Sequence, residues 1–355
     1  MRQDAEKLLL NGAFLPAMPL VLNEDRQFDE AGQRRLIRYY LEAGADGLAV
    51  GVHTTQFAIR DPKINLFERV LLASKDEMNL YTARTGRPLL TIAGVCGETA
   101  QAVSEAEKAV SMGYDAVLVS PGGLKDKSED ELIDRSKNIA EVSDIVGFYL
   151  QVAVGGRVFS YDFWQQICQI KRLRAIKAAP FNRYLTADVA RAIAFADHKI
   201  ALYTGNDDSI VQDLLTTYSF WDGERTLSVR ARGGLLGHWS AWTKTAVDLF
   251  RQIKALPDGA PVDPKLLTLG AQITDANSAF FDSRNDFAGV IAGMHEVLRR
   301  QGLMKGIWCL NPKETLGPGQ AREIDRVYAQ YPELNDDEFV KEFLKRDQAL
   351  HPEAY

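Results

Sequence analysis

The chain of 355 residues is 46% hydrophobic and 25% charged, a composition typical of soluble globular proteins. Its 48 acidic residues outnumber 42 lysines and arginines, and the net charge of −6 leaves no basic field that would attract nucleic acid or an anionic membrane. We therefore expect neither a nucleic-acid partner nor a membrane partner.

Charges interrupt the first 22 residues before they reach an apolar run, and that run contains Pro16 and Pro19. This pattern predicts neither a signal peptide nor a membrane span. The three cysteines, Cys96, Cys168 and Cys309, lie far apart and form no C-x-x-C pair. They are typical of buried thiols in a reducing compartment, which predicts a cytoplasmic protein.

Eight short apolar runs are predicted to form strands. In chain order they span residues 14–22, 47–51, 88–95, 116–121, 147–154, 174–180, 201–205 and 233–239. Amphipathic segments between them, such as 29–44 and 98–113, predict helices. Apolar strands alternating with amphipathic helices indicate a parallel sheet covered by helices, and eight repeats favour a closed (β/α)₈ TIM barrel.

An open doubly wound sheet is the alternative to the barrel. However, the first strand-to-helix turn lacks the G-x-G-x-x-G pattern of dinucleotide-binding sheets. After about residue 251 the pattern changes to helices without strands, and Pro257, Pro261 and Pro264 mark the boundary. We predict a barrel domain over residues 1–255 and a C-terminal helical extension, packed on the barrel, over residues 256–355.

Lys177 stands in the sixth predicted strand, within the apolar run AIKAAP. It could be an ordinary lysine whose head reaches water, a buried partner of a carboxylate, or a lysine kept neutral for chemistry. In TIM barrels the working groups lie at the carboxyl ends of the strands. Tyr149, in the fifth strand, is expected at the same mouth, and a desolvated lysine there can form a Schiff base with a ketone.

At these residues the chain resembles the dihydrodipicolinate synthase and N-acetylneuraminate lyase superfamily of Schiff-base-forming class I aldolases. FYLQV is similar to the family's tyrosine strand and AIKAA to its lysine strand, and the 28-residue spacing from Tyr149 to Lys177 is the one expected. Residues 43–51, 99–121, 202–208 and 286–306 are similar as well. We identify the chain as a divergent member.

The resemblance implies roles for individual residues. Lys177 would form an imine with pyruvate or a related 2-oxo acid, and Tyr149 would carry the proton as general acid and base. The loop after the second strand would hold the substrate carboxylate, and its residues are Gly51, Val52, His53, Thr54 and Thr55. The resemblance also implies no metal or organic cofactor, a small-molecule partner, and a homo-oligomer, either dimer or tetramer.

The loop after the second strand departs from the family pattern. The family usually has G-T-T-G-E, whereas residues 51–57 read GVHTTQF. Without a gap, Val52 and His53 take the places of the two threonines; with a two-residue insertion, Thr54 and Thr55 do. His53 could act as an acid or base, donate to the carboxylate, or be a loop histidine without a catalytic role.

Two other departures concern the second substrate. Residues 120–128, SPGGLKDKS, replace a tyrosine pair of the synthases, and Val154 stands where they have an arginine. Arg157 is a candidate substitute for that arginine. Gly205, Asn206 and His238 are further substrate-binding candidates, with a helix cap as the alternative for Asn206.

These observations predict a class I lyase that is not the lysine-pathway synthase. Aldol cleavage or condensation and dehydration of a 3-deoxy-2-oxo sugar acid both pass through the same enamine, so both reactions stay open. One alternative is an altered barrel that only binds a 2-oxo acid. Another is a metal-dependent barrel lyase or hydrolase, although the sequence has no H-x-H, no H-E-x-x-H and no carboxylate cluster.

Overall fold

The computed structural model describes residues 1–352 of the chain. Its strands are β1 (Phe14–Pro16), β2 (Gly47–Val50), β3 (Leu90–Val95), β4 (Ala116–Val119), β5 (Ile145–Leu150), β6 (Leu173–Ala179), β7 (Ala201–Thr204), β8 (Thr217–Trp221) and β9 (Thr226–Leu236). The first nine α-helices are α1 (Gln3–Asn11), α2 (Glu30–Ala43), α3 (Phe67–Thr85), α4 (Thr99–Ser111), α5 (Glu129–Val142), α6 (Tyr161–Ile167), α7 (Arg183–Ala194), α8 (Ile210–Leu215) and α9 (Thr243–Lys254).

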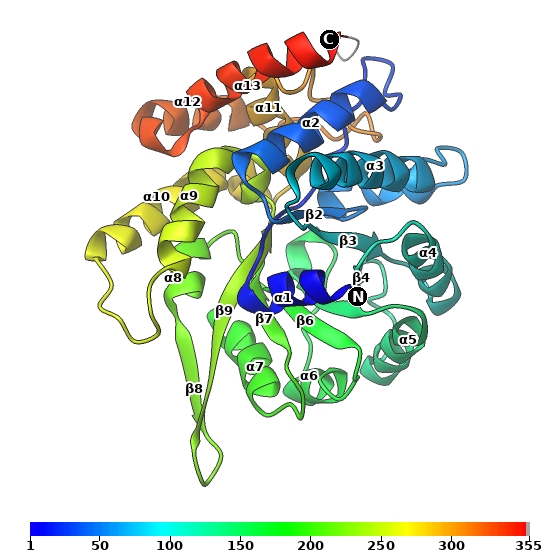
Figure 1. Ribbon diagram of the computed structural model, residues 1–355, viewed down its shortest axis with the longest axis vertical. Helices are drawn as coiled ribbons and strands as arrows, with labels where there is room; N and C mark the ends of the chain where they lie inside the picture. The colour runs from blue at the N-terminus through cyan, green and yellow to red at the C-terminus, as the bar shows by residue number, and fades with distance from the viewer. Residues whose placement is uncertain (353–355) are drawn as a thin grey trace.

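Strands β1 to β7 and β9 form a TIM barrel (Figure 1). Each pairs in parallel with its neighbours, and β9 lies between β7 and β1. A parallel bridge between Ala17 and Ala49 joins β1 to β2 and closes the ring. All eight predicted strands are present, so the predicted barrel is confirmed.

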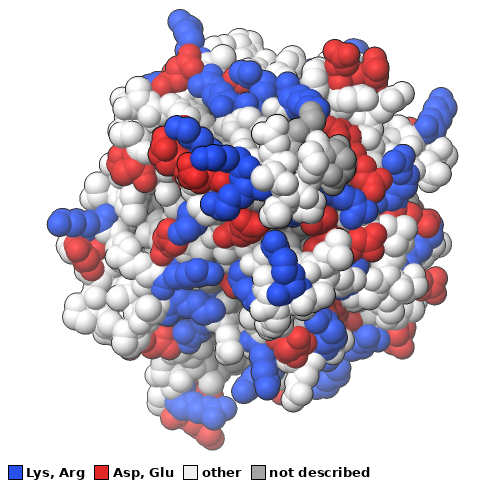
Figure 2. Space-filling view, turned by 45° about the horizontal axis from the view of Figure 1, so that its top comes forward, with Lys and Arg blue, Asp and Glu red and all other residues white. Residues whose placement is uncertain are grey.

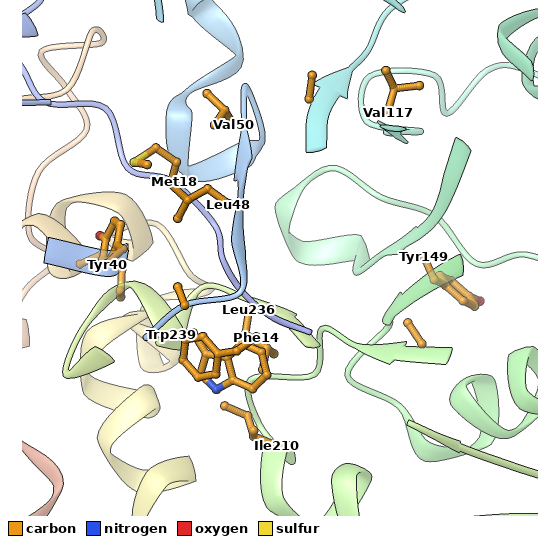
Figure 3. Packing of buried hydrophobic residues seen from close by; sticks show 14 of the residues in the cluster. Phe14, Met18, Tyr40, Leu48, Val50, Val117, Tyr149, Ile210, Leu236 and Trp239 are labelled. Carbon is orange, nitrogen blue, oxygen red and sulfur yellow. The ribbon is translucent and has the colours of Figure 1, made fainter. Parts of the chain in front are cut away.

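The barrel strands bury both faces, which is why they read as continuous apolar runs. One set of side chains fills the inside of the barrel, including Leu15, Ile92, Leu118, Phe148, Ala175 and Leu235. The alternate set packs outward against the helices. Figure 3 shows part of this outer cluster, including Phe14, Val117 and Tyr149.

Helix α1 covers the amino-terminal end of the barrel. Leu9 belongs to the cluster inside the barrel. The hydroxyl of Tyr203 donates to the Leu9 carbonyl at 2.8 Å and accepts the Ala13 N–H at 2.9 Å. The sequence analysis did not predict this helix. Because α1 closes this end, the opposite end of the barrel, where the strands finish, is the one available for a site.

A β-hairpin of β8 and β9 projects from the barrel and was not predicted (Figure 1). Along β8, exposed and half-buried residues alternate, and Trp221 near the tip is 66% exposed. A search for continuous apolar runs overlooks this pattern because a strand outside the barrel alternates polar and apolar side chains. Only the part of β9 inside the barrel was predicted.

The C-terminal segment is helical, as predicted. Its helices are α10 (Pro264–Phe280), α11 (Val290–Arg300), α12 (Gln320–Gln330) and α13 (Asp337–Leu350). They lie together beside α2 (Figure 1), where Arg38 Nη2 donates to Asp347 Oδ2 at 2.8 Å. The division at residues 255 and 256 stays a prediction, and residues 353–355 of the predicted extension lie outside the described residues.

Basic and acidic side chains are interspersed over the face seen in Figure 2, with no large area of one sign. Within residues 1–352, no helix combines the length and the apolar character needed to cross a bilayer. The three cysteines are unpaired and buried, as predicted. The described part of the chain holds no group of three His, Cys, Asp or Glu side chains arranged to bind a metal ion.

Candidate active site

A hollow of about 620 Å³, its mouth included, opens at the carboxyl end of the barrel strands. Strands β5, β6 and β7 supply its floor, and loops after β2 and β9 supply part of its wall. The segment between α10 and α11 covers it with Phe281, Phe287 and Val290. Its lining side chains with polar groups are His53, Thr54, Gln151, Lys177 and Asp207.

Lys177 lies inside the barrel and is only 9% exposed. Its neighbours two residues away, Ala175 and Ala179, belong to the interior cluster, and its Nζ lies 4.4 Å from the centroid of the Phe148 ring. No hydrogen bond or salt bridge reaches Lys177 from residues 1–352. Burial lowers the pKa of Lys177 to about 8, although the Asp207 carboxylate acts in the opposite direction.

Asp207 follows β7 and lines the same hollow at 9% exposure. Its Oδ1 accepts the main-chain N–H of His238 at 2.8 Å, which fixes the carboxyl group in place. Burial raises the pKa of Asp207 to about 7, opposed by the His238 N–H and by the charge of Lys177. A carboxyl group that titrates near neutrality can both give and take a proton.

The loop after β2 turns into a short 3-10 helix, His53–Thr55. Thr55 is buried outside the hollow, where its hydroxyl accepts the Gly51 N–H at 3.0 Å and donates to the Met18 carbonyl at 2.7 Å. Thr54 lines the hollow, but its hydroxyl donates to the Ala17 carbonyl at 2.9 Å. Both hydroxyls therefore hold the loop against β1.

His53 is brought to Lys177 by this loop. Although part of its ring faces the hollow, the surrounding protein lowers the pKa of His53 to about 4, and the positive charge of Lys177 adds to this effect. His53 is therefore neutral at physiological pH, with one ring nitrogen able to donate and the other able to accept. Val52 lies beside it in the wall, and Gly51 contributes no lining atoms.

Tyr149, the predicted proton shuttle, does not reach the hollow. It belongs to the outer cluster, 1% exposed, with its ring 5.2 Å from that of Trp164 (Figure 3). Its hydroxyl accepts the Phe159 N–H at 3.0 Å. On β5 it is Phe148 and Leu150 that face inward, so the structure does not bring Tyr149 and Lys177 together.

A register shift between β5 and β6 explains this difference. Ile145 pairs with Leu173, an offset of 28 residues, but Val146 pairs with Ala175, an offset of 29 residues. One additional residue in β6 therefore changes the alignment before the strands reach Lys177. Beyond it, Phe148 stands opposite Lys177, whereas the 28-residue spacing predicted Tyr149.

Two of the remaining candidates face away from the hollow. Arg157 donates to the Lys127 carbonyl, and its guanidinium lies 5.5 Å from the centroid of the Phe159 ring. Asn206 is fully buried, with Nδ2 donating to Asp213 Oδ2 at 2.8 Å. Their side chains are occupied by bonds within the protein.

Gly205 lines the hollow, whereas the His238 side chain does not. The His238 ring is 3% exposed and is stacked on Phe280 with the centroids 6.3 Å apart. Burial lowers the pKa of His238 to about 4. Only its main-chain N–H serves the site, by holding Asp207.

Sequence reasoning missed several residues of the hollow. Asp207 was interpreted as part of a helix cap, although its position directly after a barrel strand was a usable signal. Strand alternation on β5 could have identified Phe148. The aromatic residues Phe181, Phe281 and Phe287 carried no such signal, because the last two come from beyond the barrel.

Comparison with known proteins supports these observations. The sequence model of the Dihydrodipicolinate synthetase family matches residues 11–217. A 4-hydroxy-tetrahydrodipicolinate synthase of Bifidobacterium longum (strain DJO10A) is 28% identical over 207 residues, which are 55% of this chain and 60% of the relative. That of Thiobacillus denitrificans (strain ATCC 25259 / T1) is 26% identical over 57% of this chain and 64% of the relative. The matches thus span less than two thirds of these relatives.

Solved structures share the fold across most of the chain. Dihydrodipicolinate synthase from Oceanobacillus iheyensis has a TM-score of 0.73 at 16% identity and covers 93% of this chain and 100% of its own. N-acetylneuraminate lyase from Fusobacterium nucleatum, complexed with pyruvate, has a TM-score of 0.68 at 18% identity and covers 92% of this chain and 99% of its own. The resemblance inferred from the sequence is confirmed, and the chain belongs to the dihydrodipicolinate synthetase family.

Proposed function

We propose that the protein is a class I lyase that acts on pyruvate or a related 2-oxo acid through a Schiff base at Lys177. The observation that carries this proposal is a buried lysine without a salt bridge, at the carboxyl end of a TIM barrel, whose pKa is lowered to about 8. A substantial fraction of such a lysine is the neutral, nucleophilic amine at neutral pH. Family membership and the pyruvate complex of a related lyase fold are consistent with it.

The reaction follows from this amine. Lys177 attacks the 2-oxo carbon, water leaves, and the protonated imine withdraws electrons from the adjacent carbon. Loss of a proton or cleavage of the C–C bond next to the imine then gives an enamine, and water finally releases the amine. The iminium itself is the electron sink, so the scheme uses no metal or organic cofactor. Aldol chemistry and dehydration share this enamine.

We assign the proton transfers to Asp207. Tyr149 was predicted for this role, but its hydroxyl lies in the outer cluster and is bonded to Phe159. The Asp207 carboxyl lines the hollow with Lys177, is held by the His238 N–H, and has a pKa raised to about 7. General acid and base catalysis is most effective when the pKa lies near the working pH.

We assign the substrate carboxylate to the loop after β2. Val52, His53 and Thr54 line the hollow next to Lys177. The N–H groups in the first turn of a helix have no partner within the helix and can donate to an anion. The neutral His53 ring adds a donor without adding a charge. A cytoplasmic location and a homo-oligomer remain predictions from the sequence.

Borohydride trapping tests the proposal. The protein is incubated with pyruvate, reduced, digested and examined by mass spectrometry, and we expect an adduct on Lys177 that is absent from Lys177→Ala. Lys75→Ala is the matched control, because Lys75 is a second buried lysine, 8% exposed and with a lowered pKa, that does not line the hollow.

If pyruvate and longer 2-oxo acids leave no adduct on Lys177, the Schiff-base function is refuted. Stabilisation of the protein by pyruvate without any adduct would instead favour a barrel that only binds a 2-oxo acid. Activity that is lost in a chelator would favour a metal-dependent enzyme.

A further inference from the structure

The wall of the hollow above Lys177 is made mainly of aromatic and branched apolar side chains. Four phenylalanines come from four separate segments, and they are Phe148, Phe181, Phe281 and Phe287. Val154 and Val290 extend this surface. No arginine of the described chain lines the hollow, and the Arg157 guanidinium is bonded elsewhere. This part of the hollow can bury an apolar group but offers little to a polar one.

Phe181 and Phe287 form a pair at the mouth. Their ring centroids are 5.9 Å apart and the rings are inclined by 76°. Both residues have left-handed backbone conformations, with φ of 52° for Phe181 and 64° for Phe287. This conformation is unfavourable for a bulky side chain and persists only where the surroundings enforce it.

The surroundings of both residues do enforce it. The Phe181 N–H donates to the side chain of the buried Asn206 at 2.9 Å. The Phe287 N–H donates to the Asp282 carbonyl at 3.1 Å. The Asp282 carboxylate accepts from Asn285 Nδ2 at 2.6 Å and from the Gly289 N–H at 3.1 Å, so it ties the whole turn. Two aromatic rings are thus held rigidly over the hollow despite backbone strain.

The hydrogen-bonding groups of the hollow are few. Once Lys177 is bound in an imine, the remaining polar side chains are His53, Thr54, Gln151 and Asp207. Thr54 already donates its hydroxyl to the Ala17 carbonyl. A molecule with a chain of hydroxyls needs a partner for each one that it buries, since a buried hydroxyl without a partner is costly. An aromatic group needs only apolar surface and can pack edge to face with phenylalanine rings.

We propose that the carbonyl compound joined to the 2-oxo acid, or released from it, is an aldehyde with an aromatic or similarly apolar substituent. This inference rests on the proposed function. In the forward step the enamine carbon attacks the aldehyde carbon to form a C–C bond, and the aldehyde oxygen takes a proton. Water then cleaves the imine, which frees Lys177 and a 4-hydroxy-2-oxo acid; the reverse sequence releases the aldehyde and the 2-oxo acid.

The test compares two aldehydes with pyruvate as the common partner. Benzaldehyde represents the aromatic class and erythrose the polyhydroxylated class, and mass spectrometry follows the 4-hydroxy-2-oxo acid product. We expect kcat/KM to be at least about 30-fold higher for benzaldehyde, because each hydroxyl buried without a partner costs a factor of about ten. Borohydride trapping of pyruvate on Lys177 is measured in parallel.

Variants locate this selectivity at the aromatic wall. Phe287→Asn keeps a residue that tolerates the left-handed conformation but replaces apolar surface with an amide. It should lower the ratio of the two kcat/KM values by roughly tenfold or more, whereas Phe287→Leu should largely retain the ratio. Phe195→Asn, outside the hollow on a half-exposed aromatic, is the control. A ratio measured within one variant cancels any partial loss of folded protein.

The outcomes separate the inference from the proposed function. If Lys177 traps pyruvate but erythrose is the better substrate, or neither aldehyde reacts, the aromatic assignment is overturned and the Schiff-base function stands. If Phe195→Asn changes the ratio as much as Phe287→Asn, the aromatic wall does not determine the preference. If no 2-oxo acid is trapped, both proposals fail.

Discussion

The absence of a side chain at Gly205 makes room for Lys177. A Cβ atom at position 205 would lie 2.5 Å from Lys177 Cε and 2.8 Å from Ala179 Cβ, both closer than van der Waals contact allows. Gly205 also anchors β7 to β6, since its N–H donates to the Ala178 carbonyl at 2.7 Å. The glycine therefore determines where the lysine head lies in the hollow.

Gly205→Ala should impair imine formation more than it impairs folding. Because the added methyl group meets the lysine stem, we expect the rate of borohydride trapping by pyruvate to fall by roughly tenfold or more, in line with the usual cost of overpacking. Gly122→Ala is the control, since a Cβ there meets no atom closer than 3.3 Å. Equal trapping rates in the two variants would show that Lys177 has room to move aside.

The pH dependence of trapping should report the environment of Lys177. Only the neutral amine attacks the ketone, so the rate should rise with pH and level off above the lowered pKa of about 8. Asp207→Asn removes the negative charge that favours the ammonium form, so it should move the inflection to lower pH. The measurement is the initial trapping rate between pH 6 and about pH 11, the span that contains both the lowered and the ordinary lysine pKa.

Asp208→Asn is the control for this shift. Asp208 is the next residue along the chain, does not line the hollow, and lies 3.5 Å from Arg183. The inflection should stay at its wild-type position in this variant. An inflection near the ordinary pKa of lysine in the wild-type protein, or the same shift in both variants, would contradict the described environment of Lys177.

The barrel could be predicted from the sequence because its strands are buried on both faces and therefore read as apolar runs. The hairpin at Thr217–Trp221 could not be predicted in that way, since it lies outside the barrel and alternates exposed and half-buried residues. Helix α1 was also overlooked, because only Ala5 and Leu9 of its nine residues are buried. Burial on one side leaves a weaker pattern than burial on two.

The site was predictable only where a local pattern carries it. Lys177 stands out because a cation amid alanines of a buried strand needs an explanation. The inward position of Phe148 instead depends on one additional residue in β6, which a count of residues between two strands does not reveal. Phe287 reaches the hollow through packing of the C-terminal segment, and such long-range contacts leave no local pattern.

Replacement of Lys177 should stabilise the protein in a pH-dependent manner. The folded state lowers the pKa of Lys177 to about 8, so between that value and the ordinary pKa the unfolded chain binds the additional proton and stability rises with pH. Below this window the wild-type protein carries the full cost of a buried ammonium. Lys177→Met should therefore be more stable at pH 7 by about 2 to 4 kcal/mol, and this gain should shrink toward pH 10.

Urea unfolding at pH 7 and at pH 10 measures this gain. Lys137→Met is the control, because Lys137 is exposed and its replacement should change the free energy of unfolding by less than about 0.5 kcal/mol at either pH. A stability gain from Lys177→Met that is the same at both pH values would arise from packing alone. It would show that the lysine is not held in an environment that disfavours its charge.

Tyr149→Phe distinguishes the two assignments of the proton carrier. The Tyr149 hydroxyl accepts the buried Phe159 N–H, so its removal should lower the free energy of unfolding by about 1 to 3 kcal/mol. Turnover of pyruvate and an aldehyde should stay within about threefold of wild type, because removal of a general acid or base costs about 100-fold or more and this hydroxyl does not line the hollow. Tyr114→Phe is the matched control, since it also removes a buried hydroxyl that bonds to the main chain, at 2.8 Å from the Leu71 carbonyl. A loss of turnover of about 100-fold in Tyr149→Phe alone would restore the tyrosine as proton carrier in place of Asp207.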